Sequence, residues 1–327
     1  MKFPIVAMNR RYALAVAVAA LLVGQDALAW TDRPVKLLVP APAGGTADVF
    51  ARLISDQLSA EIGQPVVVEN KPGAGGAIAV QALRAAPANG QTLLVCASNV
   101  LTEVPHVLKS SFDPLKDVTP VAALAKGTMV LVGSPTLAAT DVKGLAAYFK
   151  SHPGGNFASY SAGTSSQYAG LIFSQKAGLD LQHVPFPGSP PALVELMAGR
   201  IPIMFDGLTT SKAMITSGKL KVFGVASKAR SPQLPNVPTM AEQGYPDLDF
   251  GNWMGVIAAS GTSPELAAKI HAALARVGAN PKVRERLTAN GFDPVEDQPA
   301  DKLAQSVKAE YERNGAIVKA FDIRLNN

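Results

Sequence analysis

Short apolar segments alternate with amphipathic segments along most of the chain. The apolar segments are five to seven residues long, and the first four end at Pro, Asn, Ser or Gly, as buried strands do. We expect strands at 35–40, 65–70, 92–98, 129–133, 156–161, 181–186, 201–206, 221–227 and 253–259. We expect helices from about 46 to 63, at 76–90, from about 165, and at 191–199, 264–280 and 300–321. The alternation predicts an α/β fold with mainly parallel sheets in two blocks, and it leaves open whether the C-terminal helices return to the first block.

The first 29 residues have the features of a secretory signal peptide. Basic residues up to Arg11 precede an apolar run from Ala13 to Val23, and Ala27-Leu28-Ala29 forms a small-x-small cleavage site. The run is too short for a spanning helix, so a retained anchor is the less favoured alternative, as is a twin-arginine signal. We expect export and a mature chain that begins at Trp30.

Charge and cysteine content narrow the class of protein. Residues 1–29 hold three of the 30 Lys and Arg residues and one of the 25 Asp and Glu residues, so the rest of the chain has a formal net charge of +3. No basic run with interleaved aromatic residues occurs, so we expect no nucleic-acid partner. Cys96 is the only cysteine, which excludes an internal disulfide and, because it lies mid-chain, a lipid-carrying cysteine after the signal. We therefore expect a free periplasmic monomer that is not a lipoprotein, long enough for two domains.

The stretch VPAPAGGTAD, residues 39–48, joins an expected strand to an expected helix. Such a turn leaves the first amides of the helix without partners inside the helix. Gly44 and Gly45 let a ligand approach the backbone, and the helix dipole favours a negative group there. The turn suits a carboxylate or phosphate, although a plain turn with Thr46 as its cap explains the same residues. Asp48 would repel a second anion unless it points away and fixes the loop.

Two other glycine-containing stretches do not match nucleotide-binding motifs. In NKPGAGGAI, residues 70–78, Ile78 stands where the third glycine of a dinucleotide fingerprint should stand. Gly218-Lys219 is followed by Leu220 and not by Ser or Thr, so it is no Walker loop. We expect no cofactor, and the scattered histidines predict no metal site.

Catalytic motifs are not visible in the sequence. The chain has no Gly-x-Ser-x-Gly elbow, and Cys96 has no nearby histidine in sequence. His183 and His271 lie inside an expected strand and helix, where a structural role is expected. The turn SAGTSSQ, residues 161–167, brings hydroxyls and free amides to another helix start. Together these features suggest a protein that binds a solute between two lobes, and the alternative is an exported α/β hydrolase or isomerase.

Seven motifs extend through nearly the whole mature chain. They are VPAPAGGTADVFAR (39–52), VVVENKPGAGGAIA (66–79), GTSSQYAG (163–170), VPFPGSPPALVELMAGRIPIMFD (184–206), SGKLKVFGVASKAR (217–230), LPNVPTMAEQGYP (234–246) and WMGVIAASGTSPE (253–265). They resemble the substrate-binding proteins of tripartite tricarboxylate transporters, also called the Bug family. The resemblance implies a type II-like, two-lobe periplasmic-binding-protein fold with the ligand cleft between the lobes, and a non-enzymatic receptor that serves a membrane transporter or sensor. It implies a discontinuous first lobe, 30–129 plus 253–327, and a second lobe, 130–252.

The resemblance also implies where the ligand binds. In such proteins a small carboxylated molecule is held mainly by backbone amides and waters of facing loops. By position, the implied contacts fall on the turn before the first helix, on the end of a first-lobe strand, and on helix starts and strand ends of the second lobe. They are Ala43, Gly44, Gly45, Thr46, Ala47, Asp48, Ser98, Asn99, Thr164, Ser165, Ser166, Phe186, Pro187, Gly188, Ser189 and Asp206.

The chain departs from the family pattern at two expected cleft loops. Gln167-Tyr168 replaces a common His-Leu, and Phe186-Pro187-Gly188 replaces a common Tyr-Lys-Gly. These changes remove a phenolic hydroxyl and two groups that can carry positive charge. We therefore expect the part of the ligand beyond its carboxylate to be less polar than a di- or tricarboxylate, unless the replaced Lys and His lie outside the cleft.

Overall fold

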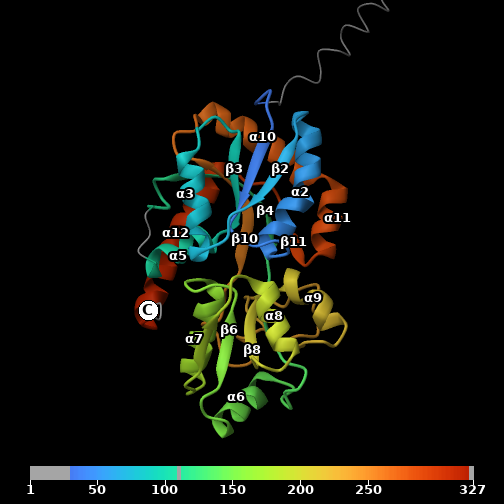
Figure 1. The fold of residues 1–327 in the computed structure, drawn as a ribbon, viewed down its shortest axis with the longest axis vertical. Helices are drawn as coiled ribbons and strands as arrows, with labels where there is room; N and C mark the ends of the chain where they lie inside the picture. Colours follow the sequence, from blue (N-terminus) through green and yellow to red (C-terminus); the bar gives the residue numbers. More distant parts are fainter. Residues whose placement is uncertain (1–29, 109–111, 324–327) are drawn as a thin grey trace, which may run out of the picture.

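Two β-sheets, each covered by helices, make up the part of the chain that the structure describes (Figure 1). The computed structural model describes residues 30–108 and 112–323, so the expected signal peptide lies outside the described residues. The first sheet has the order β11 (Phe292–Pro294), β4 (Val118–Gly127), β10 (Asn252–Ala259), β3 (Thr92–Ala97), β1 (Val35–Val39) and β2 (Val66–Asn70). The second has the order β7 (Gln182–Pro185), β6 (Asn156–Ser159), β8 (Ile203–Gly207), β5 (Met129–Gly133) and β9 (Lys221–Val225). We call each sheet with its helices the first half and the second half.

Helices cover both faces of each sheet. On the first sheet, α2 (Thr46–Ile62), α10 (Pro264–Ala279) and α11 (Pro281–Ala289) pack on one face, and α3 (Ala77–Ala85), α4 (Asn99–Thr102) and α12 (Ala300–Ala320) pack on the other. The short segments η1 (Ala74–Gly76) and α5 (Val104–Val107) belong to the same half. On the second sheet, α6 (Val142–Ser151) and α7 (Ser165–Lys176) oppose α8 (Ser189–Met197) and α9 (Leu208–Thr216).

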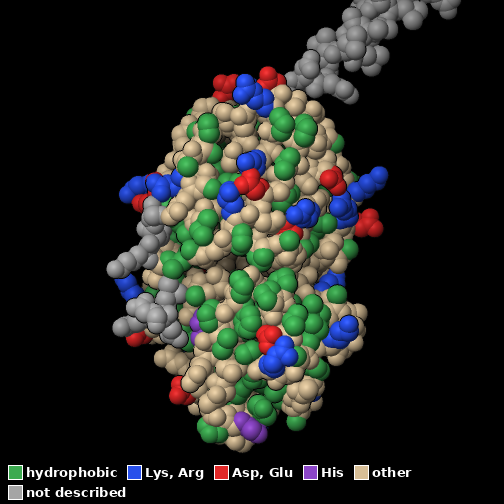
Figure 2. Space-filling view, viewed as in Figure 1, with side chains coloured by type: hydrophobic (Ala, Val, Ile, Leu, Met, Phe, Trp, Pro, Cys, Tyr) green, Lys and Arg blue, Asp and Glu red, His purple; other side chains and the backbone are tan. Residues whose placement is uncertain are grey.

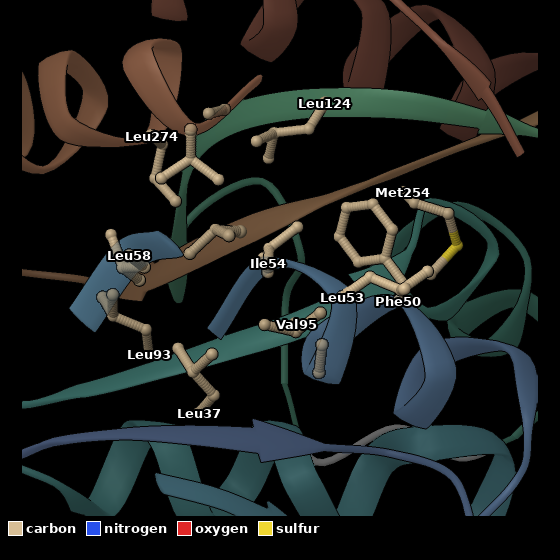
Figure 3. Close-up of a cluster of buried hydrophobic side chains, with 14 of the residues drawn as sticks. Leu37, Phe50, Leu53, Ile54, Leu58, Leu93, Val95, Leu124, Met254 and Leu274 are labelled. Atoms are coloured by element: carbon tan, nitrogen blue, oxygen red, sulfur yellow. The ribbon is translucent and has the colours of Figure 1, made fainter. Parts of the chain in front are cut away.

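The core of the first half shows why these segments fold as they do. Neighbouring residues of β1 point to opposite faces, so Leu37 packs under α2 and Leu38 packs under α3. Phe50, Ile54 and Leu58 recur on one face of α2 and pack against the sheet (Figure 3). Burial of side chains of this size contributes about 1.5–3 kcal/mol each. The helix ends at its Gly63 cap, whose φ of 66° suits glycine.

Both sheets mix strand directions: most strands of each sheet run one way, as expected for mainly parallel sheets, and a minority run the other way. In the first sheet β1 pairs in parallel with β2 and β3, whereas β10 is antiparallel to β3 and β4 and β11 is antiparallel to β4. In the second sheet β6 is parallel to β7 and β8, and β5 is antiparallel to β8 and β9. Strands buried on both faces have the same apolar composition whichever way they run, so the sequence pattern does not encode their direction.

The chain passes between the halves at defined points. It leaves the first sheet at Gly127, the end of β4, and enters the second at Met129, the start of β5, and it returns with Asn252 of β10. Helix α12 also reaches both halves, because Leu303 lies in the core of the first half while Ile317 and Phe321 pack against the core of the second (Figure 1). Within residues 30–108 and 112–323, no helix is both long and apolar enough to cross a membrane.

Candidate ligand-binding site

A cavity of about 330 Å³ lies between the two halves, at the ends of several strands and the starts of several helices. Both halves supply its wall, with Thr46 and Asn99 from the first and Thr164 and Ser189 from the second. Among the described residues that line it there is no Lys, Arg, Asp, Glu or His. The centre of the waist in Figure 2 likewise shows hydrophobic and uncharged surface, with charged side chains above, below and at its edges. An anion in this cavity would therefore be held by backbone amides and hydroxyl groups.

The turn before α2 is held in shape by Asp48. Its carboxylate accepts hydrogen bonds from the Gly44 amide at 2.9 Å, from Asn70 Nδ2 at 2.9 Å and from Arg52 Nε at 3.0 Å. Burial alone would raise the pKa of Asp48, but these hydrogen bonds and the charge of Arg52 outweigh it and lower the pKa. Asp48 does not line the cavity. It points away and fixes the loop, which removes the conflict with a second anion.

The start of α8 is held by a second buried acid. Ser189, the first residue of α8, donates its hydroxyl to Asp206 Oδ1, and Thr210 of α9 donates its hydroxyl to Oδ2. Asp206 is fully buried and lies behind the cavity wall. Burial raises its pKa to about 6, although the hydrogen bonds from Ser189, Thr210 and the Gly207 amide oppose the rise.

The structure separates the expected contacts into two groups. Eight line the cavity: Gly45, Thr46, Ala47, Asn99, Thr164, Pro187, Gly188 and Ser189. Eight do not: Ala43, Gly44, Asp48, Ser98, Ser165, Ser166, Phe186 and Asp206. Most of the second group support the wall from behind, as when Ser166 donates its hydroxyl to the Phe205 carbonyl at 2.5 Å.

Several residues of the cavity wall are not among the contacts expected from the sequence. Gly73, Gly75 and Gly76 of the stretch that fails the dinucleotide test line the cavity. The sequence does hold a signal for these glycines. They follow a strand and precede a helix, as Gly44 and Gly45 do in the stretch 39–48. Tyr160 and Asn252 also line the wall, and no motif marked them.

The halves touch each other beside the cavity. A Cβ built on Gly188 would overlap the ring of Pro42, so only glycine allows these two loops to lie this close. Lys212 of α9 donates from Nζ to the carbonyls of Thr288 and Ala289, at 3.3 and 3.0 Å, where α11 ends in the first half. A cation at a helix C-terminus is favourable because of the helix dipole.

Groups that could serve an enzyme lie away from the cavity. Ser159 Oγ and His183 Nε2 are 2.6 Å apart, but Ser159 is fully buried and neither residue lines the cavity. Burial lowers the pKa of His183 to about 4 and raises the pKa of the Cys96 thiol to about 12. Among the described residues, no group of three or more His, Cys, Asp or Glu side chains could hold a metal ion.

Residues 50–323 match the family described as tripartite tricarboxylate transporter family receptor, TctC. The chain belongs to this family. The match covers well over half of the sequence, so the expected Bug-type family is confirmed. As a TctC family member, the chain is a solute-binding receptor.

Solved structures support the same fold for this TctC member. The periplasmic binding protein BugD is 30% identical, has a TM-score of 0.85, and is matched over 90% of this chain and 99% of its own. An R. palustris protein with adipate is 29% identical, with a TM-score of 0.86 and the same two coverages of 90% and 99%. MatC from Rhodopseudomonas palustris with bound malate is 33% identical, with a TM-score of 0.82 over 88% of this chain and 99% of that chain. The predicted periplasmic-binding-protein fold is thus confirmed.

Proposed function

We propose that this receptor captures a small carboxylate-bearing solute in the cavity and delivers it to a membrane transporter or sensor. One observation carries the proposal. Helix α2 starts at the cavity with Thr46 and Ala47, whose amides precede the first bond inside the helix, and the lining side chains carry no charge. The structural relatives with adipate and with bound malate support a carboxylate as the ligand.

We propose direct ligand contact for the eight expected residues that line the cavity. The buried acids Asp48 and Asp206 would act indirectly, because each holds a helix start in place without lining the cavity. Preorganised amides lower the cost of ordering the site when the ligand binds.

We propose that the halves are two lobes, 30–129 plus 253–327 and 130–252, that close on the ligand. The support is that the chain changes sheets beside Thr128 and Asn252, both of which line the cavity. The end of α12 contacts the second half, so it would move against that half during closure.

We infer that the chain is an exported monomer that binds without catalysis. The support is the family itself, together with the burial of Cys96 and of Ser159 away from the cavity.

A thermal-shift screen over mono-, di- and tricarboxylates, aromatic acids and amino acids tests the proposal, with the corresponding alcohols and primary amides as controls. A ligand at about 100 times its Kd should add about 2.7 kcal/mol to the free energy of unfolding. Carboxylates should stabilise the protein, their amides should not, and NMR should show the ligand unchanged. Failure of all carboxylates would refute the proposed ligand class, and turnover would favour the hydrolase or isomerase alternative.

A further inference from the structure

A buried carboxylate of the first half lies at the start of a helix of the second half. Glu103, between α4 and α5, is 4% exposed. Ser165, the first residue of α7, donates its Oγ to Glu103 Oε2 at 2.6 Å, and its amide also bonds to this carboxyl group. Tyr168 donates its hydroxyl to the Glu103 carbonyl at 3.0 Å. The protein's own acid thus takes the place that an anionic ligand would take at α7.

The neighbouring donor at this helix start is also used inside the protein. The amide of Gly163, just before the helix, donates to Gln167 Oε1 at 2.7 Å. Thr164 lines the cavity, so the wall at this point is formed by a helix start whose dipole is already compensated by Glu103.

At the other two helix starts of the second half that lie at the cavity, some of the first amides are missing or are used inside the protein. Pro190 and Pro191 occupy the second and third positions of α8 and have no amide hydrogen. The amide of Gly188 donates to the Tyr160 carbonyl at 2.9 Å. At α9, the Leu208 amide donates to the Thr128 carbonyl at 2.8 Å.

Helix α2 begins at the cavity with none of its first three amides used inside the described part of the protein. Its first internal bond runs from the Val49 amide to the Gly45 carbonyl at 3.0 Å, so the amides of Thr46, Ala47 and Asp48 have no acceptor inside the helix. Thr46 and Ala47 line the cavity. Helix α2 therefore gives the cavity a well-supplied subsite for an anion on the side of the first half.

A second anionic group of the ligand would lie against an unfavourable part of the cavity wall, on the side of the second half. Burial, and next the charge of Glu103, raise the pKa of the Tyr160 hydroxyl, so the field of this acid reaches a residue that lines the cavity. Apolar residues such as Pro72, Val100 and Met129 form much of the remaining wall. A second carboxylate would lose its hydration there with no cation to replace it.

We propose that Glu103 determines specificity, and that the cavity selects solutes with a single carboxylate, held at the start of α2, on an uncharged and mainly apolar body. The inference rests on the proposed binding of carboxylates and narrows it to monocarboxylates. Glu103 acts as a positioning residue, since it does not line the cavity and acts on it through its bond at the start of α7 and through the effect of its charge at Tyr160.

Matched pairs of probes test the selectivity of the full mature chain by calorimetric titration at pH 8. The pairs are butanoate with succinate, hexanoate with adipate, and benzoate with terephthalate, which differ in the second carboxylate. In the pair that binds best, the monocarboxylate should have a Kd at least about tenfold lower than its partner. A dicarboxylate that binds equally well or better would overturn the inference and leave the proposed function intact. If none of the six probes binds, the inference is also overturned. The broader carboxylate screen then decides whether the proposed function fails too.

Substitutions test the role of Glu103 itself. Glu103→Gln keeps the size of the side chain and removes its charge, so selectivity should fall to less than about threefold, mainly through tighter dicarboxylate binding. Glu103→Asp keeps the charge and should keep the preference, and Glu285→Gln makes the same change on the exposed surface of α11 as a control. A purely structural role would change both affinities in proportion, and an unchanged ratio in Glu103→Gln would exclude Glu103 as the determinant. If Glu103→Gln does not fold, Glu103→Asp and the wild-type pairs still decide.

Discussion

Ser189 donates its hydroxyl to Oδ1 of Asp206 at 2.6 Å, and this bond ties the start of α8 to the end of β8. Thr210 donates to the other carboxylate oxygen, also at 2.6 Å. Asp206 therefore connects three elements whose ends form part of the cavity wall, although it does not line the wall itself. This geometry favours support of the site over direct contact with the ligand.

Replacing Asp206 should therefore reduce stability in the absence of ligand. Asp206→Ala leaves the buried Ser189 hydroxyl without its acceptor and removes one of the two acceptors of the half-buried Thr210 hydroxyl, so the free energy of unfolding should fall by about 1–3 kcal/mol in urea denaturation. Asp180→Ala, an exposed change in the same half, should stay within about ±0.5 kcal/mol. Unchanged stability together with lost affinity would instead place Asp206 in contact with the ligand.

Glu103 should give the protein a characteristic pH dependence. Burial raises its pKa from 4.5 to about 7; Ser165 and Arg313 oppose the rise, and Glu310 adds to it. Because the folded-state pKa is the higher one, the stabilising contribution is complete below about pH 4.5 and is lost as the pH rises to about 7. The stability of the wild type should fall through this window by up to about 1.4 kcal/mol per pH unit relative to Glu103→Gln.

Denaturation in urea at several pH values measures this difference. The nearby Tyr160 and Tyr168 stay neutral in this range, since burial raises both of their pKa values above the usual value. Asp206 causes a similar loss of stability between about pH 3.8 and 6 in the wild type and in Glu103→Gln. Only the difference in stability between these two proteins therefore reports on Glu103. Parallel stability curves would show that Glu103 has an ordinary pKa in the folded protein.

The sequence was sufficient for the nine expected strands and for the six expected helices, because apolar periodicity reports burial directly. It missed β4, whose run VTPVAALAKG contains Pro120 and Lys126 and lacks a clean alternation. It missed α11 because its mean composition is polar, with only Val283 and Leu287 buried. The pattern of apolar and polar residues indicates how a segment is buried. It does not indicate which strand lies beside the segment or in which direction that strand runs.

The site was harder to predict, since position along the chain does not say which way a side chain points. Asp48 and Asp206 stand at a helix start and a strand end, where a ligand contact was a reasonable hypothesis, yet both turn into the protein. No sequence pattern marks Glu103, because its partner Ser165 is 62 positions away in the sequence. Contacts between the two halves join residues that lie far apart in the sequence, so no short sequence motif predicts them.

Asp48 should control the shape of the turn at α2. Asp48→Ala removes the acceptor of the Gly44 amide and one of the two acceptors of Asn70 Nδ2, so the free energy of unfolding should fall by about 1–3 kcal/mol. The Kd for the carboxylate found in the screen should rise at least about tenfold, because the amides of α2 lose their fixed direction. Asp56→Ala in the same helix, where the side chain is 82% exposed, should change neither quantity. Full affinity in Asp48→Ala would show that the turn needs no such support.

Gly188 should be needed for the contact between the two loops that face each other. In Gly188→Ala the new Cβ overlaps the ring of Pro42, so the halves cannot approach as closely and the Kd should rise at least about tenfold. Gly218→Ala is the control, because Gly218 also has a positive φ, 71°, but nothing lies within 4 Å of a Cβ there. Both variants should lose some stability through backbone strain, and only Gly188→Ala should lose affinity. Equal affinities would mean that the Pro42 loop yields without affecting the site.

Lys212 should favour the closed arrangement of the halves. Its ammonium group bonds to the last carbonyls of α11 in the first half and to Gln233 Oε1 at 2.8 Å. In Lys212→Met both carbonyls lose the ammonium group, although Thr288 keeps the Gly291 amide as a donor. A cation at a helix end contributes about 0.3–1 kcal/mol, so the ligand-free population should shift toward open forms. Small-angle scattering should then give a larger radius of gyration than the wild type without ligand and the same radius with ligand. Lys219→Met, an exposed change in the same half, should leave both radii unchanged. An identical ligand-free radius in Lys212→Met and wild type would show that this contact does not influence closure.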